Sequence, residues 1–104
     1  MKVYISGKIT GNSHYTEDFA KAEEFIKAKG YKPYNPIKIG LELTYEEHLQ
    51  LDFKLIEMCD CIYMLKGWQN SKGAVAELTY AKALSKKIKY EGKQWSLKKT
   101  IDNE

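Results

Sequence analysis

The feature that most constrains the fold is a short apolar run at residues 61–65, which leads through a loop into a long helical pattern. An apolar run of this length predicts a strand buried on both faces, as is typical of parallel sheets. A strand that passes through a loop into a helix presents the free N–H groups of the helix start, and these attract anions. The loop and helix start at residues 67–77 are therefore the first place to look for a functional site.

Strand and helix patterns alternate along the rest of the chain. Other β-rich runs cover residues 2–6, 31–34 and 88–90, and helical patterns cover residues 15–30, 44–58 and 74–85, with two lysines at 86–87 expected in the last helical turn. Pro33 places the second run at a sheet edge or strand end, Gly30 is suited to a helix C-cap, and Thr44 with Glu47 forms a capping box. This alternation predicts an α/β fold, a small Rossmann/flavodoxin-like three-layer domain with a mainly parallel sheet of four or five strands.

The size and composition of the chain narrow the function classes. With 104 residues it is expected to form one domain, residues 1–104, whose last stretch, 93–104, is a polar C-terminal tail. A net charge of +3 gives no strong field for a nucleic acid polymer, and no apolar run is long enough to span a membrane. Cys59 and Cys61 are too close in one extended segment to pair, so two free thiols indicate a reducing, cytoplasmic location.

Three residues could carry chemistry if they reach the carboxyl edge of the sheet. Glu77 is either a solvated helix glutamate or a working carboxylate, and its alanine neighbours at 74, 76 and 81 favour a close approach to the helix. Asp52 is either a surface residue or a proton donor with a raised pKa. Tyr4, with Val3 and Ile5 on the opposite strand face, is either a core tyrosine or a hydroxyl that holds a carboxylate in position.

Residues of the neighbouring loops have equally open alternatives. Ser71 is a helix N-cap or a ligand for a phosphate or hydroxyl group, Trp68 is a platform for a planar base or a loop anchor, and Lys8 meets an anion or solvent. Asp60 is expected to cap the preceding helix. The two histidines have no companions that suggest a metal site, and no phosphate-loop or dinucleotide motif is present, so no metal or cofactor is expected.

Several segments, taken in order, resemble the nucleoside 2-deoxyribosyltransferase-like superfamily. The stretch Val-Tyr-Ile-Ser-Gly-Lys-Ile-Thr-Gly at residues 3–11 resembles its opening motif. Asp52, then Cys59 and Asp60 ahead of the buried strand, then Ser-Lys-Gly-Ala-Val-Ala-Glu at residues 71–77 continue the resemblance in order and spacing. It covers residues 2–90, and Gly67 with Trp68 is most similar to a short branch whose function is unassigned.

The resemblance implies cleavage or exchange of the N-glycosidic bond of a 2′-deoxynucleoside or its 5′-monophosphate, without a cofactor. Glu77 corresponds to the nucleophile that forms a covalent glycosyl-enzyme, as in retaining glycosidases. Tyr4 corresponds to the tyrosine that orients this glutamate, and Asp52 to the acid that protonates the departing base. The substrate-binding positions that the motifs imply are Ser6, Gly7, Lys8, Ile9, Gly11, Trp68, Ser71 and Gly73.

Ser71 favours a nucleotide over a nucleoside. Superfamily members that act on free nucleosides tend to have an acid at this position, whereas the 2′-deoxynucleoside 5′-phosphate N-hydrolases resemble this chain in having serine. An aspartate would repel a phosphate that serine and helix N–H groups accept. Thr10 stands where those hydrolases have arginine, and Lys8 is the candidate to replace its charge.

The resemblance also implies a homodimer or higher homo-oligomer, because a second subunit often completes the sugar site in this superfamily. Ser96 is the candidate for the residue so contributed. Two functions remain open: an N-glycosidase or deoxyribosyltransferase, and a non-catalytic protein that binds or sequesters nucleotides in the same pocket. In either case the expected partner is a small deoxynucleoside or deoxynucleotide, with no nucleic acid polymer and no membrane.

Overall fold

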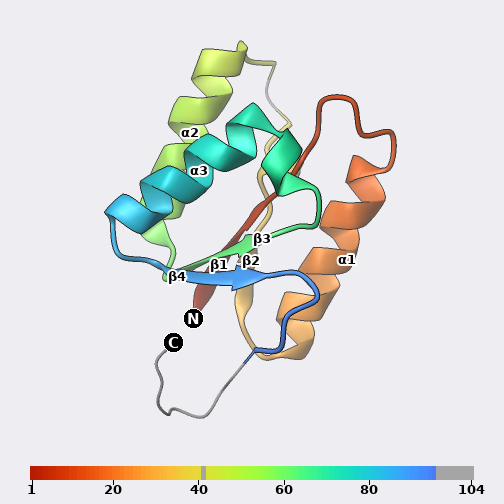
Figure 1. The fold of residues 1–104 in the computed structure, drawn as a ribbon, viewed down its shortest axis with the longest axis vertical. Helices are drawn as coiled ribbons and strands as arrows, with labels where there is room; N and C mark the ends of the chain where they lie inside the picture. Colours follow the sequence, from red (N-terminus) through yellow and green to blue (C-terminus); the bar gives the residue numbers. More distant parts are fainter. Residues whose placement is uncertain (41, 96–104) are drawn as a thin grey trace.

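A four-stranded parallel sheet lies between one helix on one face and two helices on the other (Figure 1). The computed structural model describes residues 1–40 and 42–95. The strands are β1 (Lys2–Ser6), β2 (Lys32–Tyr34), β3 (Cys61–Met64) and β4 (Lys87–Tyr90). The α-helices are α1 (Tyr15–Ala28), α2 (Tyr45–Met58) and α3 (Lys72–Ala83). Two short 3-10 helices are η1 (Pro36–Lys38) and η2 (Trp68–Asn70). The predicted three-layer α/β fold is confirmed, and its described sheet has four strands.

The order of the strands positions the site. The sheet runs β2-β1-β3-β4, so the chain moves outward from β1 to β2 and then crosses back to the other side of β1. The direction of winding therefore reverses between β1 and β3, and ligands of open parallel sheets bind in the crevice at this point. The loops after β1 and β3 both start there, and the backbone N–H of Leu65 donates to the carbonyl of Ser6 at 2.8 Å. As Pro33 predicts, β2 is an edge strand.

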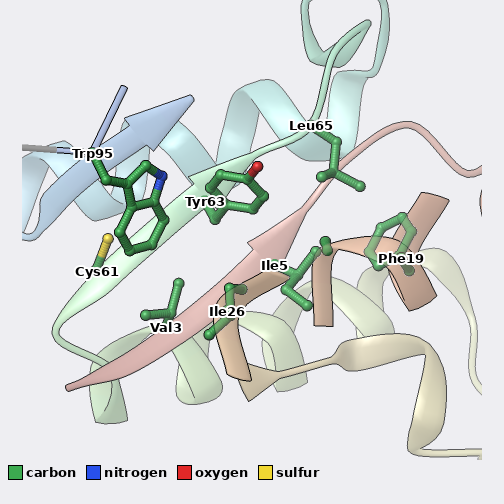
Figure 2. Close-up of a cluster of buried hydrophobic side chains, with 9 residues drawn as sticks. Val3, Ile5, Phe19, Ile26, Cys61, Tyr63, Leu65 and Trp95 are labelled. Carbon is green, nitrogen blue, oxygen red and sulfur yellow. The ribbon is translucent and has the colours of Figure 1, made fainter. Parts of the chain in front are cut away.

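The α1 face of the sheet is covered by one hydrophobic cluster. Side chains alternate along β1, so Val3 and Ile5 point toward α1 and pack against its Phe19 and Ile26. Figure 2 shows these residues together with Cys61, Tyr63, Leu65 and Trp95.

A second cluster lies under α2 and α3. Ile62 and Met64 of β3 pack there with Ala74, Leu78 and Ala81 of α3. Two of the alanines that were expected to allow a close approach to the helix, at positions 74 and 81, are core residues that let α3 approach the sheet, and Ala74 also lines the pocket described below. No helix in the described part of the chain has the length and apolar character to cross a membrane.

The helix ends follow local capping chemistry. The Thr44 hydroxyl accepts from the N–H of Glu47 at 3.1 Å, and the Glu47 carboxylate accepts from the N–H of Thr44 at 2.9 Å, which confirms the capping box. Gly30 has φ +84° just after α1, the left-handed conformation that favours glycine. The prediction that the third helix covers residues 74–85 is wrong at both ends. The helix begins two residues earlier, at Lys72 after the cap Ser71, and ends two residues earlier, at Ala83, before Ser85 with φ 59°.

Asp60 also differs from its expected role. Its carboxylate accepts a hydrogen bond from the backbone N–H of Lys2 at 2.8 Å. It therefore ties the start of β1 to the start of β3 and does not cap the preceding helix.

Trp95 belongs to the core although it lies in the stretch expected to be a polar tail. Its side chain is 6% exposed and stacks on Tyr31 with ring centroids 5.7 Å apart, while Phe25 and Tyr63 meet it edge-on. The ordered fold thus extends at least to residue 95. Ser96 and the remainder of the expected tail lie outside the described residues.

Replacing Trp95 with alanine should lower the free energy of unfolding by about 3 kcal/mol, because truncating a buried aromatic side chain leaves a cavity. Urea titration followed by circular dichroism measures the change. The exposed neighbour Gln94 supplies the control, and Gln94→Ala should change stability by less than about 0.5 kcal/mol. Equal stabilities of the two variants would show that residue 95 is not part of the fold.

Candidate active site

Glu77 is buried in the first half of α3. It lies on the side of the helix that faces the sheet, with Ala74, Leu78 and Ala81, and only 7% of it is exposed. Burying a carboxyl group is unfavourable unless other polar groups satisfy it. Its position therefore requires partners within the protein.

Two hydroxyl groups of β1 are those partners. Tyr4 and Ser6 project from the same face of the strand because side chains alternate along it. The Tyr4 hydroxyl donates to Glu77 Oε2 at 3.1 Å, and the Ser6 hydroxyl donates to Oε1 at 2.6 Å. Each carboxyl oxygen thus accepts one hydrogen bond, and the plane of the group is fixed. Ser6, expected to bind substrate, contacts Glu77 instead.

Asp52 projects from α2 toward the same carboxyl group. It lines a pocket together with Glu77, and the two carboxyl groups are close enough for each to shift the pKa of the other. Burial raises the pKa of Asp52, while hydrogen bonds with Glu77 and Tyr4 and the nearby His48 act in the opposite direction.

The two carboxyl groups form a pair that holds a proton. Burial raises the pKa of Glu77 well above its ordinary value, the contact with Asp52 raises it further, and the Ser6 and Tyr4 hydroxyls oppose both. Two carboxyls so close do not both ionise readily, so they share one proton. The contact with Asp52 raises the pKa of Glu77 and the contact with Glu77 lowers that of Asp52, while the hydroxyl donors favour the negative charge on Glu77, so the proton can move between the two carboxyls. Burial, followed by the Glu77 charge, raises the pKa of Tyr4 well above 10.0, so Tyr4 remains a neutral donor.

The pocket extends from this pair and has a volume of about 770 Å³. This size suits a nucleotide-sized ligand, since small-molecule pockets occupy about 300–1,000 Å³. Its walls are the loop after β1 at residues 7–10, the start of α3 with residues 70–74, one side of α2, Tyr15 and Phe19 of α1, and Pro36, Ile37 and Gly40 after β2.

The structure brings most of the predicted site residues into this pocket. Those that line it are Tyr4, Gly7, Lys8, Ile9, Asp52, Ser71, Gly73 and Glu77. Ser6, Gly11 and Trp68 are not part of the lining. Trp68 packs beside Tyr90, with ring centroids 6.0 Å apart, so it is a loop anchor in this structure. Glycine is required at position 7 for a steric reason, because a Cβ atom there would lie only 2.9 Å from Leu65 Cδ1.

Ser71 is the helix N-cap that the sequence offered as one alternative, and its place in the pocket wall leaves its role as a ligand residue a prediction. Its hydroxyl accepts from the N–H of Ala74 at 3.1 Å, which caps α3, and the residue also lines the pocket. Lys8 and Lys72 line the pocket as well. The pocket lining therefore includes two basic residues and the N-terminus of α3, features that attract anions.

Three α2 residues on the same helix face as Asp52 were not predicted from the sequence. Tyr45, His48, Leu49 and Asp52 follow the i, i+3, i+4, i+7 spacing of a single helix face, and all four line the pocket. The spacing was available as a signal, but a mixed polar and apolar stripe does not by itself distinguish a pocket wall from a surface. Within residues 1–40 and 42–95, no group of three His, Cys, Asp or Glu side chains is placed to hold a metal ion.

Comparisons with known proteins identify the family and the fold. The model of a family described as "Domain of unknown function (DUF4406)" matches residues 1–90. No curated protein matches the sequence.

Three solved structures show the same fold at low sequence identity. A 2-desoxiribosyltransferase from Leishmania mexicana matches with a TM-score of 0.68 and 20% identity over 86% of this chain and 62% of that one. A CMP N-glycosidase from Clostridium botulinum matches with a TM-score of 0.66 and 21% identity over 86% of this chain and 70% of that one. A 2-deoxyribosyltransferase from Bacillus psychrosaccharolyticus matches with a TM-score of 0.71 and 19% identity over 93% of this chain and 78% of that one. The superfamily fold that the sequence motifs predicted is confirmed. This chain spans 62% of the length of the Leishmania protein.

Replacing Glu77 with glutamine should stabilise the protein at neutral pH. A carboxyl whose pKa is raised by folding binds protons more tightly in the folded state, so stability falls as pH rises from the ordinary value of 4.5 through the raised pKa. Glutamine does not ionise, so the variant escapes this loss.

Chemical denaturation between pH 4 and pH 8, bracketing the ordinary pKa of a glutamate at about 4.3, measures the effect. The gap between Glu77→Gln and wild type should open as pH rises and close in acid. Exposed Glu24, replaced with glutamine, should follow the wild-type curve. A gap that stays constant with pH would contradict the raised pKa.

Proposed function

The chain belongs to the DUF4406 family, and we propose that it is an N-glycosidase that cleaves 2′-deoxynucleoside 5′-monophosphates or transfers their deoxyribosyl group between bases. The observation that carries the proposal is the Glu77 carboxyl, held by the hydroxyls of Tyr4 and Ser6 beside Asp52 in a nucleotide-sized pocket. Cleavage through an oxocarbenium-like transition state needs one ionised and one protonated carboxyl, and this pair supplies both.

In the first step, the Glu77 carboxylate attacks C1′ of the deoxyribose. The bond between C1′ and the base nitrogen breaks, and its electron pair leaves with the base, which takes the proton of Asp52. The products are the free base and a deoxyribosyl ester of Glu77. The hydroxyls of Tyr4 and Ser6 keep the carboxylate in one orientation for the attack.

In the second step, a water molecule attacks C1′ and gives a proton to the Asp52 carboxylate. The ester bond breaks, which releases 2-deoxyribose 5-phosphate and restores the Glu77 carboxylate. A second base in place of water would give deoxyribosyl transfer. The acid of the first step thus serves as the base of the second, as in retaining glycosidases.

The proteins of similar fold support this class of reaction, since they are named as deoxyribosyltransferases and a CMP N-glycosidase. With identities near 20%, however, the substrate is inferred from the chain's own residues. Ser71 and Lys72 at the start of α3, with Lys8 of the loop after β1 in the same pocket lining, favour a substrate with a 5′-phosphate. We also propose that a second copy of the chain completes the sugar site.

The wild-type protein should release free base from deoxynucleoside monophosphates, and Glu77→Gln should abolish the release. Asp52→Asn should lower kcat by about 10²–10⁴-fold, because the base then leaves without its general acid. Chromatographic separation of base from nucleotide measures both effects.

A substrate with a cationic base separates the two roles. The base of 7-methyl-2′-deoxyguanosine 5′-monophosphate leaves as a neutral molecule without protonation, so Asp52→Asn should retain most activity on it while Glu77→Gln should not. Equal losses in both variants would contradict the assignment of Asp52 as the acid. Nucleotide binding without base release would instead indicate a nucleotide-sequestering protein.

Replacing Ser71 with aspartate tests the preference for a phosphate. Aspartate caps a helix as well as serine does, so α3 should stay intact. The added charge should lower kcat/KM for monophosphates by about tenfold or more, the effect of about 1.4 kcal/mol of repulsion, and leave nucleosides unaffected. A parallel loss on nucleosides and nucleotides would argue against a phosphate beside residue 71.

A further inference from the structure

One wall of the pocket is formed by the segment between β2 and α2, in which η1 is the single regular element among the described residues. Pro36, Ile37 and Gly40 of this segment line the pocket. We propose that Glu23 of α1 is a positioning residue that holds this wall in place. The expected effect of Glu23 on substrate binding rests on the proposed function, whereas its effect on the position of the wall does not.

Glu23 is a buried charge with a full set of donors. Only 8% of the residue is exposed. Its Oε1 accepts from Asn35 Nδ2 at 2.9 Å, and its Oε2 accepts from Lys38 Nζ at 2.9 Å and lies 3.2 Å from Lys27 Nζ. The hydrogen bonds from Asn35 and Lys38 are the main causes that lower the pKa of Glu23 to about 2. The carboxylate therefore stays charged throughout the neutral range.

Glu23 determines which way the Asn35 amide faces. A carboxylate only accepts hydrogen bonds, so it selects the NH₂ end of the amide. The amide oxygen is then turned toward the N–H of Ile37, which donates to it at 3.2 Å and caps η1. A flipped amide would set two donors against each other. Three residues thus form a chain of contacts from α1 to the pocket wall.

Lys38 provides a second connection at the other end of η1. Asn35 is the N-cap and Lys38 the last residue of this helix, so Glu23 holds both of its ends. Ile37 lies between them, packs against the α1-side cluster and lines the pocket. A shift of η1 would therefore displace Ile37 and Pro36 within the pocket.

Glu23→Gln tests the proposal without relying on any activity. Glutamine keeps the size of the side chain but removes its charge and turns one acceptor into a donor that faces Asn35 or the lysines. The amides of residues 37–39 should exchange with deuterium about tenfold faster, because the hydrogen bonds that order η1 open more often. Exchange in β3 should be unchanged, and Glu24→Gln, an exposed neighbour on the same helix, should behave as wild type.

Kinetics then link the wall to the substrate. A displaced wall weakens the binding of the substrate and of the transition state by the same amount. Glu23→Gln should therefore raise KM for deoxynucleoside monophosphates by about tenfold with kcat nearly constant. A loss of folded protein would do the opposite, lowering apparent kcat with KM unchanged.

Unchanged exchange at residues 37–39 in Glu23→Gln, or faster exchange across the whole sheet, would overturn the proposal. Faster exchange at this segment with an unchanged KM would overturn its link to substrate. If the wild-type protein releases no base, the proposed function fails by itself, and dissociation constants for the same monophosphates, measured by calorimetry, take the place of KM.

Discussion

The contact of Glu77 with the hydroxyls of Tyr4 and Ser6 joins the start of α3 to the end of β1 inside the protein. Both elements flank the crevice where the strand order reverses, so the carboxyl lies at the position where a parallel sheet offers a ligand site. Small side chains make this possible, because Ala74 and Ala81 let α3 approach the sheet closely. The pocket, its acid on α2 and the anion-attracting start of α3 are all arranged around that one buried carboxyl.

Two buried glutamates of this chain show how neighbours set the state of a carboxyl. Glu23 has an amide and two ammonium groups around it, and its pKa falls to about 2, so it serves as a fixed charge. Glu77 has two hydroxyls and a second carboxyl around it, and burial raises its pKa. It therefore holds a proton more tightly than an exposed glutamate does, which lowers stability at neutral pH but suits proton transfer within the pair with Asp52. Perturbed pKa values of this kind are typical of functional sites.

The sequence predicted what depends on neighbours along the chain. The apolar run of β3, the Thr44 capping box and the glycine after α1 encode local structure, and the order of the motifs led to Glu77, Asp52 and Tyr4 as a group. Contacts between distant elements were not predictable in the same way. The contact of Ser6 with Glu77 and the buried position of Trp95 depend on how helices and chain ends pack on the sheet. Helical spacing puts Glu23 on the face of Phe19 and Ile26, whereas its contacts with Asn35 and Lys38 depend on how the segment after β2 packs on α1.

The most direct test of the central claim, that Glu77 bonds to the sugar, is mass spectrometry after incubation with a 2′-fluoro-2′-deoxynucleoside 5′-monophosphate. Fluorine destabilises the oxocarbenium-like transition state, so breakdown of the glycosyl-enzyme slows and the intermediate accumulates. We expect the mass of one fluorinated deoxyribose phosphate on the peptide that contains Glu77, and no such adduct in Glu77→Gln. Release of base with no adduct, or an adduct on a different residue, would contradict the account.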